Sequence, residues 1–314
     1  MRACWIFFFI LIRFLVNAQD ANFSLPGSVT GYLNPALIDH SKFGSLKSTY
    51  RLQWPKLDGG YNQLYNEYSH YFKRMRGYFT VFNLYENNYV ISLNNLFLNY
   101  TQTILLGKKI VIKPTFGVGY FNRKIDWTVL SFGDMIDPRS GFIYNTNDIP
   151  RGGKVTNVDF RAGLAVNLYD LTLGFSVLHL TQPDQSLIKG KSPLPMHFCF
   201  QAGYNGVLLI NREKELKIQP FFCYDVQNAS SLILFGSYVE LPSHWRAGIG
   251  FRLKDAINLM AGYNHEYFSI NLGYDYTISD LKGYTGGAYE VSIGLRILGD
   301  KHPAINSVMD SPFK

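Results

Sequence analysis

The stretches YFSINLGYDY, residues 267–276, and YEVSIGLRI, residues 289–297, alternate strictly between two kinds of side chain. Apolar or aromatic residues occupy every second position from Phe268 to Tyr276 and again from Tyr289 to Ile297. Polar or small residues, with Asp275 and Glu290 among them, fill the positions between. A period of two belongs to an extended strand whose two faces meet unlike environments. We therefore expect strands with one oily face and one polar face.

The composition of the 314-residue chain fits such strands in a lipid bilayer. Aromatic residues make up 16% of the chain and charged residues only 17%, whereas soluble domains carry roughly 25% charged residues. Tyr and Trp favour the boundary between lipid and water. Mean hydropathy is near zero, and no run beyond residue 18 has the length of apolar sequence that a spanning helix needs. These properties exclude a helical membrane bundle and favour a barrel in an outer membrane.

The two ends of the chain lack alternation. Residues 1–18 begin with Arg2, continue through an apolar run and end in Val16-Asn17-Ala18, which predicts a signal peptide cleaved near Ala18. Residues 19–41 predict an N-terminal plug or lead-in segment. Residues 42–298 predict the barrel, and residues 299–314 predict a flexible periplasmic tail. We therefore expect an integral protein of a Gram-negative outer membrane, surrounded by outer-membrane lipid.

The period of two predicts about thirteen strands between these ends. Single-chain bacterial barrels have an even number of strands, so we expect one more within residues 55–76 or 123–150. The fold class is thus all-β, a transmembrane antiparallel barrel of about fourteen strands, with twelve and sixteen as alternatives. The thirteen runs are Lys42–Trp54, Gly77–Leu84, Tyr89–Tyr100, Lys108–Asn122, Val155–Leu168, Leu171–Leu180, His197–Leu209, Leu216–Gln227, Ser231–Val239, Trp245–Leu253, Ala256–Tyr263, Tyr267–Tyr276 and Tyr289–Ile297.

The sequence offers no recognisable catalytic, cofactor or metal motif. The seven histidines are scattered without a consistent partner, and no GxSxG, Walker or HExxH string occurs. We therefore predict that the protein is not an enzyme, and we expect no cofactor or metal. Cys199 and Cys223 either pair across a hairpin or remain unpaired thiols, and their spacing does not decide between the two.

Charged residues give two further expectations. The net charge of +7 is spread over short clusters at predicted strand ends, without the continuous basic stripe of nucleic-acid-binding proteins, so we expect no nucleic-acid partner. On the polar faces of predicted strands lie four arginines that we expect to point into the barrel lumen. They are Arg161, Arg246, Arg252 and Arg296.

Two segments carry a resemblance to a known family. The first holds Asn34-Pro35-Ala36 followed by Tyr50-Arg51-Leu52-Gln53-Trp54, and the second is GGAYEVSI, which contains Gly287 and Glu290. Together with the leader and the alternating strands, this order resembles the PorP/SprF family of type IX secretion outer-membrane proteins from the Bacteroidetes. The resemblance implies a role in type IX secretion or gliding motility. It also implies partners among adhesin-like cargo C-terminal domains and periplasmic secretion-ring proteins.

The residues themselves suggest how these motifs act. Pro35 fixes its own φ and biases Asn34 towards an extended backbone, which suits a turn at the barrel mouth. Arg51 and Gln53 share one strand face, so we expect them to reach into the lumen and to hydrogen-bond the plug backbone near Asn34. The motif either closes the end of the barrel or binds a partner directly, and both interpretations stay open.

A rival function is a transporter or channel for small hydrophobic or anionic solutes, similar to the fatty-acid channels. That interpretation predicts a hydrophobic pocket in the lumen, whereas the lumenal face predicted here is polar and carries arginines. A folded adhesin is too large for the lumen of a fourteen-stranded barrel. We therefore expect an anchoring or docking role in preference to a conduit.

Overall fold

The computed structural model describes residues 20–38, 44–107, 109–137, 139–142, 144, 152–187, 190–211 and 214–297. The predicted signal peptide (1–18) and the predicted tail (299–314) lie outside these residues. Among the residues described, no helix has the length and apolar character needed to cross a bilayer.

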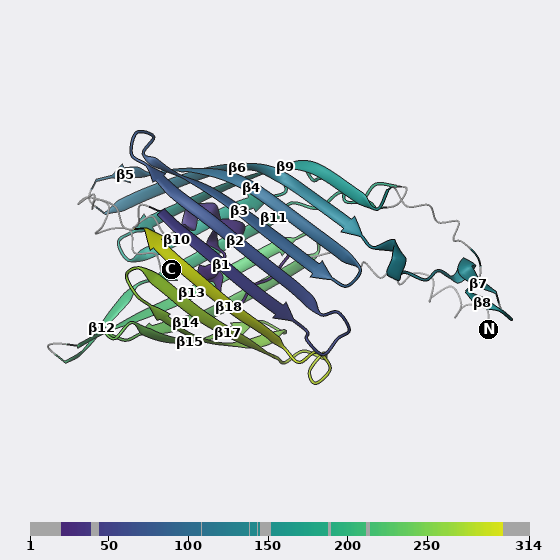
Figure 1. Ribbon diagram of the computed structural model, residues 1–314. Coiled ribbons are helices and arrows are strands. Elements are labelled where there is room, and N and C mark those ends of the chain that lie inside the picture. Colours follow the sequence, from purple (N-terminus) through teal and green to yellow (C-terminus); the bar gives the residue numbers. More distant parts are fainter. Residues whose placement is uncertain are drawn as a thin grey trace, which may run out of the picture.

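Fourteen antiparallel strands form a closed barrel (Figure 1). Consecutive strands pair with one another around the wall. The circle is completed by the pairing of β1 with β18 and of β11 with β13. The predicted all-β, fourteen-stranded barrel is therefore confirmed. The strands are β1 Gly44–Gln53, β2 Tyr61–Phe72, β3 Gly77–Asn88, β4 Ile91–Gln102, β6 Ile110–Ile125, β9 Lys154–Leu168, β10 Leu171–Leu178, β11 His197–Tyr204, β13 Lys214–Gln227, β14 Ser230–Glu240, β15 Trp245–Arg252, β16 Ala256–Asn264, β17 Phe268–Thr277 and β18 Ala288–Ile297.

The remaining strands extend this wall or lie in a loop. β5 (Ile104–Leu106) continues the line of β4 and pairs with β6, and β12 (Gly206–Asn211) continues the line of β11 and pairs with β13. Two 3₁₀ turns, η3 (Trp127–Val129) and η4 (Gly133–Met135), precede a two-stranded hairpin of β7 (Ile136–Asp137) and β8 (Gly141–Phe142). Figure 1 shows this hairpin projecting beyond one end of the barrel.

All thirteen predicted runs correspond to strands of the wall. The missing strand is β2, which lies inside the first of the two segments proposed for it, residues 55–76. In the described part of the other segment, 123–150, β6 ends, and the only further strands are β7 and β8, which lie outside the wall. Strand existence was thus predicted correctly, although the run from His197 to Leu209 is divided into β11 and β12.

The two faces of the wall differ as the alternation predicts. On β17, Leu272 points outward with 51% of its surface exposed, whereas the adjacent Asn271 is buried. On β18, Tyr289 and Val291 are exposed, and Glu290 between them is buried. An outer face of aliphatic and aromatic side chains is stable when lipid covers it.

The two ends of the barrel are also unlike. One end, hereafter the short-turn end, carries tight connections at 73–76, 169–170, 241–244 and 265–267. β18 finishes and β1 starts at this end, because Gly44 pairs with Ile297. The opposite end, hereafter the long-loop end, carries the long connections 126–153, 179–196 and 278–287 as well as the short turns 89–90, 228–229 and 253–255.

The outward face gives a stability prediction. Replacing Leu272 with Lys places a charge near the middle of the lipid-facing wall and should lower the free energy of unfolding by about 2–4 kcal/mol. The control is Leu295→Lys, because Leu295 is equally exposed but lies near the short-turn end, where the expected cost is about 0–1 kcal/mol. Denaturant unfolding in lipid vesicles measures both. Equal costs at the two positions would contradict a membrane-spanning wall.

Candidate functional site

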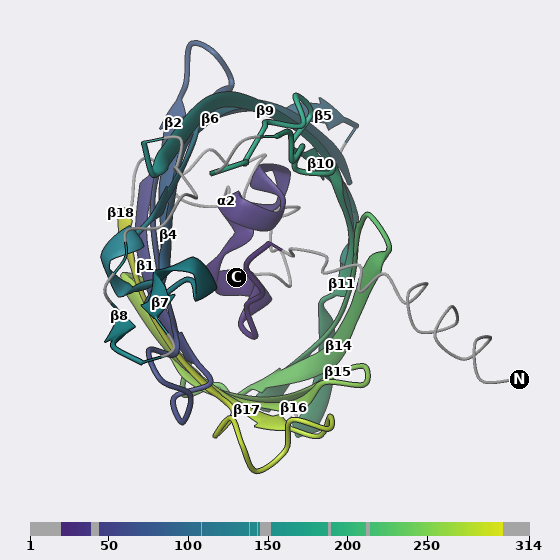
Figure 2. The ribbon, with the colours of Figure 1, turned by 90° about the vertical axis from the view of Figure 1, so that its right-hand side faces the viewer.

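Residues 20–38, hereafter the plug, lie inside the barrel, as the view along its axis shows (Figure 2). The plug contains only the 3₁₀ turn η1 (Pro26–Ser28), the short helix α2 (Thr30–Leu33) and the 3₁₀ turn η2 (Pro35–Leu37). Almost all of its residues are buried. Because so little of the segment is regular, many of its backbone N–H and C=O groups need partners from the barrel wall.

The Asn-Pro-Ala motif forms a capped turn at the carboxyl end of the plug. Asn34 has an extended backbone, and its Oδ1 accepts a hydrogen bond from the N–H of Ala36 at 3.0 Å. Pro35 occupies the first position of η2, where a missing N–H costs nothing. The Nδ2 of Asn34 donates to Oε1 of Gln201 on β11 at 3.2 Å. The motif therefore terminates the plug and ties it to the wall.

Two glycines of the wall make room for Asn34. A Cβ atom at Gly163 on β9 would lie 2.7 Å from Oδ1 of Asn34, and one at Gly174 on β10 would lie 2.9 Å from its Nδ2. Both distances are far below van der Waals contact. Any side chain at these positions would displace the plug, so the glycines on the lumenal face serve close packing.

Charged side chains of the wall form hydrogen bonds with backbone N–H and C=O groups of the short plug helix α2. The N–H of Gly31 donates to Oε2 of Glu67 on β2 at 2.9 Å. Arg161 on β9 donates through Nη1 to the carbonyls of Gly31 and Tyr32 at 3.0 and 2.9 Å. Its guanidinium lies 4.2 Å from the ring centre of Phe97, a favourable cation–π distance. Arg161 thus faces the lumen.

A buried group of five residues, hereafter the seam cluster, lies where the first and last strands meet. Arg51 on β1 binds Asp275 at 2.8 Å and Glu290 at 3.1 Å, and Arg252 on β15 binds Asp275 at 3.2 Å. Ser24 of the plug completes the cluster. Its Oγ accepts from Arg51 at 2.7 Å and from Arg252 at 2.9 Å, and its N–H donates to Glu290 at 2.8 Å. Two cations and two anions are therefore buried around one plug residue.

The seam cluster joins the two sequence motifs. Arg51 of the first motif is directly opposite Glu290 of the second in the β1–β18 ladder. The N–H of Trp54 also donates to the carbonyl of Gly287 at 2.8 Å. Gly287 has a φ of +76°, and a Cβ atom there would lie 2.1 Å from the carbonyl oxygen of Asp275, so only glycine fits.

One detail of the sequence analysis differs from the structure. We expected Arg51 to bond the plug backbone near Asn34, whereas it contacts the side chain of Ser24. The carbonyls close to Asn34 are bound by Arg161 and by Ser176, whose Oγ donates to Leu33 O at 2.6 Å. The prediction gave the correct face of β1 and the wrong partner in the plug.

The other motif residues lie around this core. Tyr50 points outward and donates through its hydroxyl to Oδ1 of Asn62 at 2.6 Å. Gln53 is partly buried at the end of β1, and Trp54 packs edge-on against Tyr61 at 5.4 Å between ring centres.

The remaining predicted lumenal arginines also have partners. Arg252 belongs to the seam cluster. Arg246 is buried, and its Nε donates to Oδ1 of Asn271 at 2.8 Å. Arg296 is only partly buried near the short-turn end, where it donates to Asn264 and to the carbonyl of His265.

A second polar group holds the plug at the long-loop end. Oδ2 of Asp20 lies 2.9 Å from Nε2 of His179 and 2.9 Å from Nδ1 of His197. On the other side of the His179 ring, Oδ2 of Asp159 lies 2.6 Å from Nδ1. Burial lowers the pKa of His179, but the charges and hydrogen bonds of Asp20 and Asp159 outweigh it and raise that pKa to about 9. Burial raises the pKa of Asp20, but the two histidines hold it well below its usual value. His179 and His197, which look unrelated in the sequence, therefore share a definite partner in Asp20.

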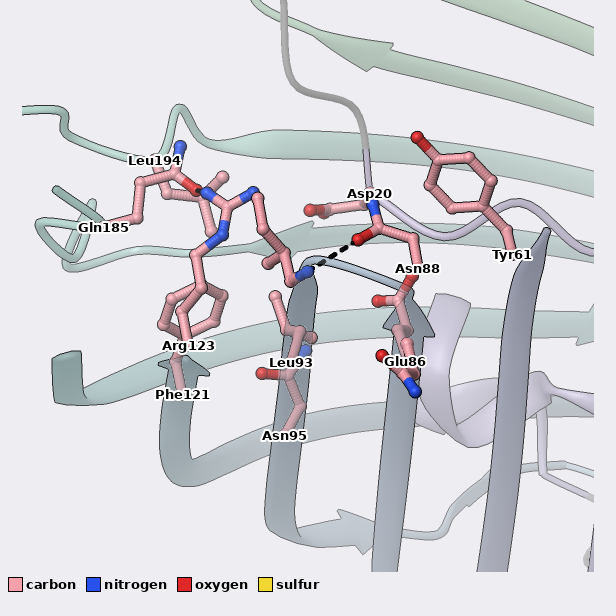
Figure 3. Close-up of a pocket in the computed structure, with 12 residues that line it drawn as sticks. Asp20, Tyr61, Glu86, Asn88, Leu93, Asn95, Phe121, Arg123, Gln185 and Leu194 are labelled. Carbon is pink, nitrogen blue, oxygen red and sulfur yellow. Dashed lines mark hydrogen bonds between the residues drawn. The ribbon is translucent and has the colours of Figure 1, made fainter. Parts of the chain in front are cut away.

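A polar recess opens beside Asp20 (Figure 3). It is open to solvent, and Glu86, Asn88 and Arg123 contribute polar groups to its lining. Arg123 donates to Oε1 of Gln185 across the recess. Such a recess can bind small polar groups.

The cysteines do not pair. Both are buried and free, and in the β11–β13 ladder Cys199 lies opposite Asp225 while Cys223 lies opposite Gln201.

A closed antiparallel wall with an apolar exterior and a polar, plugged lumen defines an outer-membrane β-barrel. Solved structures agree on the fold. The chain is similar to the CymD monoaromatic hydrocarbon channel, with 12% identity, a TM-score of 0.51 and coverage of 90% of this chain and 95% of that one. It is also similar to the toluene transporter TodX of P. putida, with 10% identity, a TM-score of 0.51 and coverage of 87% and 94%. No curated protein matches the chain in sequence.

The family follows from the sequence. Residues 15–295 match the family described as type IX secretion system membrane protein PorP/SprF. The chain belongs to this family, which confirms the resemblance carried by the two motifs. The protein is accordingly a membrane component of type IX secretion, and its location is the outer membrane.

The seam cluster gives a prediction about stability. Arg51→Met leaves Glu290 without its buried cation and should lower the free energy of unfolding by about 3–5 kcal/mol. Denaturant unfolding of the purified barrel measures the loss. The matched control is Arg51→Met combined with Glu290→Gln, which removes both charges and should recover a large part of it. A double variant as unstable as the sum of the single variants would contradict a direct ion pair.

His179 gives a prediction about pH. Because its pKa is raised from 6.5 to about 9, protonated His179 stabilises the plug fully below about pH 6.5, and this contribution is lost as the pH rises through about 9. Hydrogen exchange of the plug amides, corrected for the intrinsic effect of pH, should show protection falling over that interval. His179→Gln should remove this dependence. If the pH profile of amide protection is unchanged in His179→Gln, the loss of protection is due to another titrating group.

Proposed function

We propose that this protein, after removal of residues 1–18, is a non-enzymatic docking component of type IX secretion and gliding motility. In this role it holds adhesin-like cargo at the outer membrane and attaches periplasmic machinery to it. Membership of the PorP/SprF family is the observation that carries the proposal. The fold supports this proposal, because the closed barrel presents a surface for binding other proteins at each of its two ends.

The filled lumen supports docking over conduction. The plug is bonded to the wall at its helix by Glu67 and Arg161, and at Ser24 by the seam cluster. Releasing it would expose several buried charges together, which is costly. The barrel therefore serves better as a platform than as a passage for a folded protein.

The short-turn end offers a surface for periplasmic partners. Short turns face the periplasm in bacterial barrels. Here the β5 and β12 extensions carry exposed apolar side chains, including Leu105 and Leu208. Beside β5, a hollow open to solvent is lined by Leu105 together with Lys73 and Arg76. An apolar surface bordered by cations suits a protein segment with apolar anchors and acidic neighbours.

A solute channel is the second candidate. The likeness in fold to a hydrocarbon channel and a toluene transporter favours it. However, those likenesses have 12% and 10% identity and extend only to the fold. The lumen here is also lined by buried charges such as Arg51, Glu67 and Arg161, which disfavour an apolar solute.

The test is co-purification from native outer membranes with a tagged copy of the chain, read by mass spectrometry. We expect adhesin-like cargo and periplasmic ring proteins to accompany the barrel. Leu105→Glu combined with Leu208→Glu should remove the ring proteins. Tyr284→Glu, a control on an exposed residue of the long-loop end, should retain them. A barrel that purifies alone and conducts anions in planar bilayers would replace docking with the channel function.

A further inference from the structure

Three potential metal ligands converge on the lumenal face of β11 and β13. His197 and Cys199 are two positions apart on β11 and therefore point to the same face. Asp225 on β13 is the direct cross-strand neighbour of Cys199. Nε2 of His197 lies 3.9 Å from Oδ1 of Asp225, and the ligand atoms of all three residues lie within 4.8 Å of one another. The sequence separates the aspartate from the other two, so motif spacing does not indicate this group.

One oxygen of this group has no hydrogen-bond partner in the part of the chain that the structure describes. Asp225 is only 9% exposed, and its buried Oδ1 has no hydrogen-bond partner among the described residues. A buried, unsatisfied carboxylate oxygen is costly unless a donor or a cation meets it. This oxygen faces the histidine, so a bound cation between the two would satisfy it.

His197 is oriented in the way that metal-binding histidines usually are. Its Nδ1 is hydrogen-bonded to Oδ2 of Asp20 at 2.9 Å. This contact favours the tautomer with hydrogen on Nδ1 and leaves the lone pair of Nε2 free on the side of Asp225. The orienting carboxylate comes from the plug, whereas the three potential ligands come from the wall.

Solvent can reach the group. A small recess open to solvent, with room for about one water molecule, is lined by His197 and Asp225 together with Asp20, Asn22 and Gln227. It gives an entry path for an ion and space for a water molecule as a fourth ligand.

We propose that His197 Nε2, Cys199 Sγ and Asp225 Oδ1 bind one divalent ion of the zinc class, with water as the fourth ligand. Nitrogen, sulfur and carboxylate oxygen in a tetrahedral arrangement suit Zn²⁺, whereas Mg²⁺ and Ca²⁺ require oxygen ligands. Zinc bonds of about 2.0–2.3 Å place ligand atoms roughly 3.3–3.8 Å apart, so small side-chain rotations close the site. On binding, the Cys199 thiol releases its proton to water and the thiolate ligates the ion. The ion then links β11 and β13 and, through Asp20, fixes the outer end of the plug.

Metal titration of the untagged, full-length barrel in detergent micelles tests the proposal. After treatment with a chelator, Co²⁺ should bind at one ion per chain and produce a thiolate-to-cobalt charge-transfer band, which Zn²⁺ should abolish by displacement. Cys199→Ser should remove the band. Cys223→Ser is the matched control, because Cys223 is also buried on the same sheet but is not part of the group, and it should keep the band. Asp20→Asn should weaken binding by about 10–100-fold.

A second measurement needs no substitution and so does not depend on the folding of a variant. In the wild-type barrel, Zn²⁺ should slow alkylation of Cys199 and leave that of Cys223 unchanged, as read by mass spectrometry of the peptides. Absence of a charge-transfer band in the wild type, retention of the band in Cys199→Ser, or equal zinc protection of both cysteines would each overturn the proposal.

Discussion

The buried ion pairs that Arg51 makes with Asp275 and Glu290 are the interaction on which the rest of the structure depends. They lie where the first and last strands meet, and they also hold the plug at Ser24. Because side chains alternate along a strand, a slip of one residue between β1 and β18 would turn Arg51 towards lipid. The carboxylates of Asp275 and Glu290 would then remain in the lumen without this cation. A buried ion pair is weak evidence for stability, but here its geometry specifies one register.

The architecture of the wall was predictable because its two environments impose the period of two on the sequence itself. β2 was the strand that alternation alone did not reveal. In YNQLYNEYSHYF, Tyr65 faces the lumen and Tyr68 faces outward, so aromatic residues lie on both faces. The polar Asn66 also lies on the outward-facing side of the strand. Where the same residue type is used on both sides, hydrophobic periodicity fades, and only the even-strand rule pointed to the missing element.

The contacts inside the lumen were less predictable, for a different physical reason. Strand periodicity predicts which face of the wall a side chain occupies. It does not predict which plug residue lies at the same level along the barrel axis. Arg51 was therefore placed on the correct face and paired with the wrong part of the plug. The contact between Asp20 and His179 joins residues 159 positions apart in the chain, and the plug has no periodicity from which its path can be derived.

The direction of the plug has a consequence for assembly. Asp20 meets His179 and His197 at the long-loop end, whereas Pro35 lies by Thr101, near the opposite end. The plug therefore traverses the lumen with its amino end at the long-loop end and its carboxyl end near the short-turn end, where β1 begins. Inserting it into a finished barrel would require threading it past the buried charged side chains that bind it, such as Arg51, Glu67 and Arg161. The simpler route is for the sheet to curl around the segment, so that the plug acts as an internal template and the joining of β1 to β18 is the closing step.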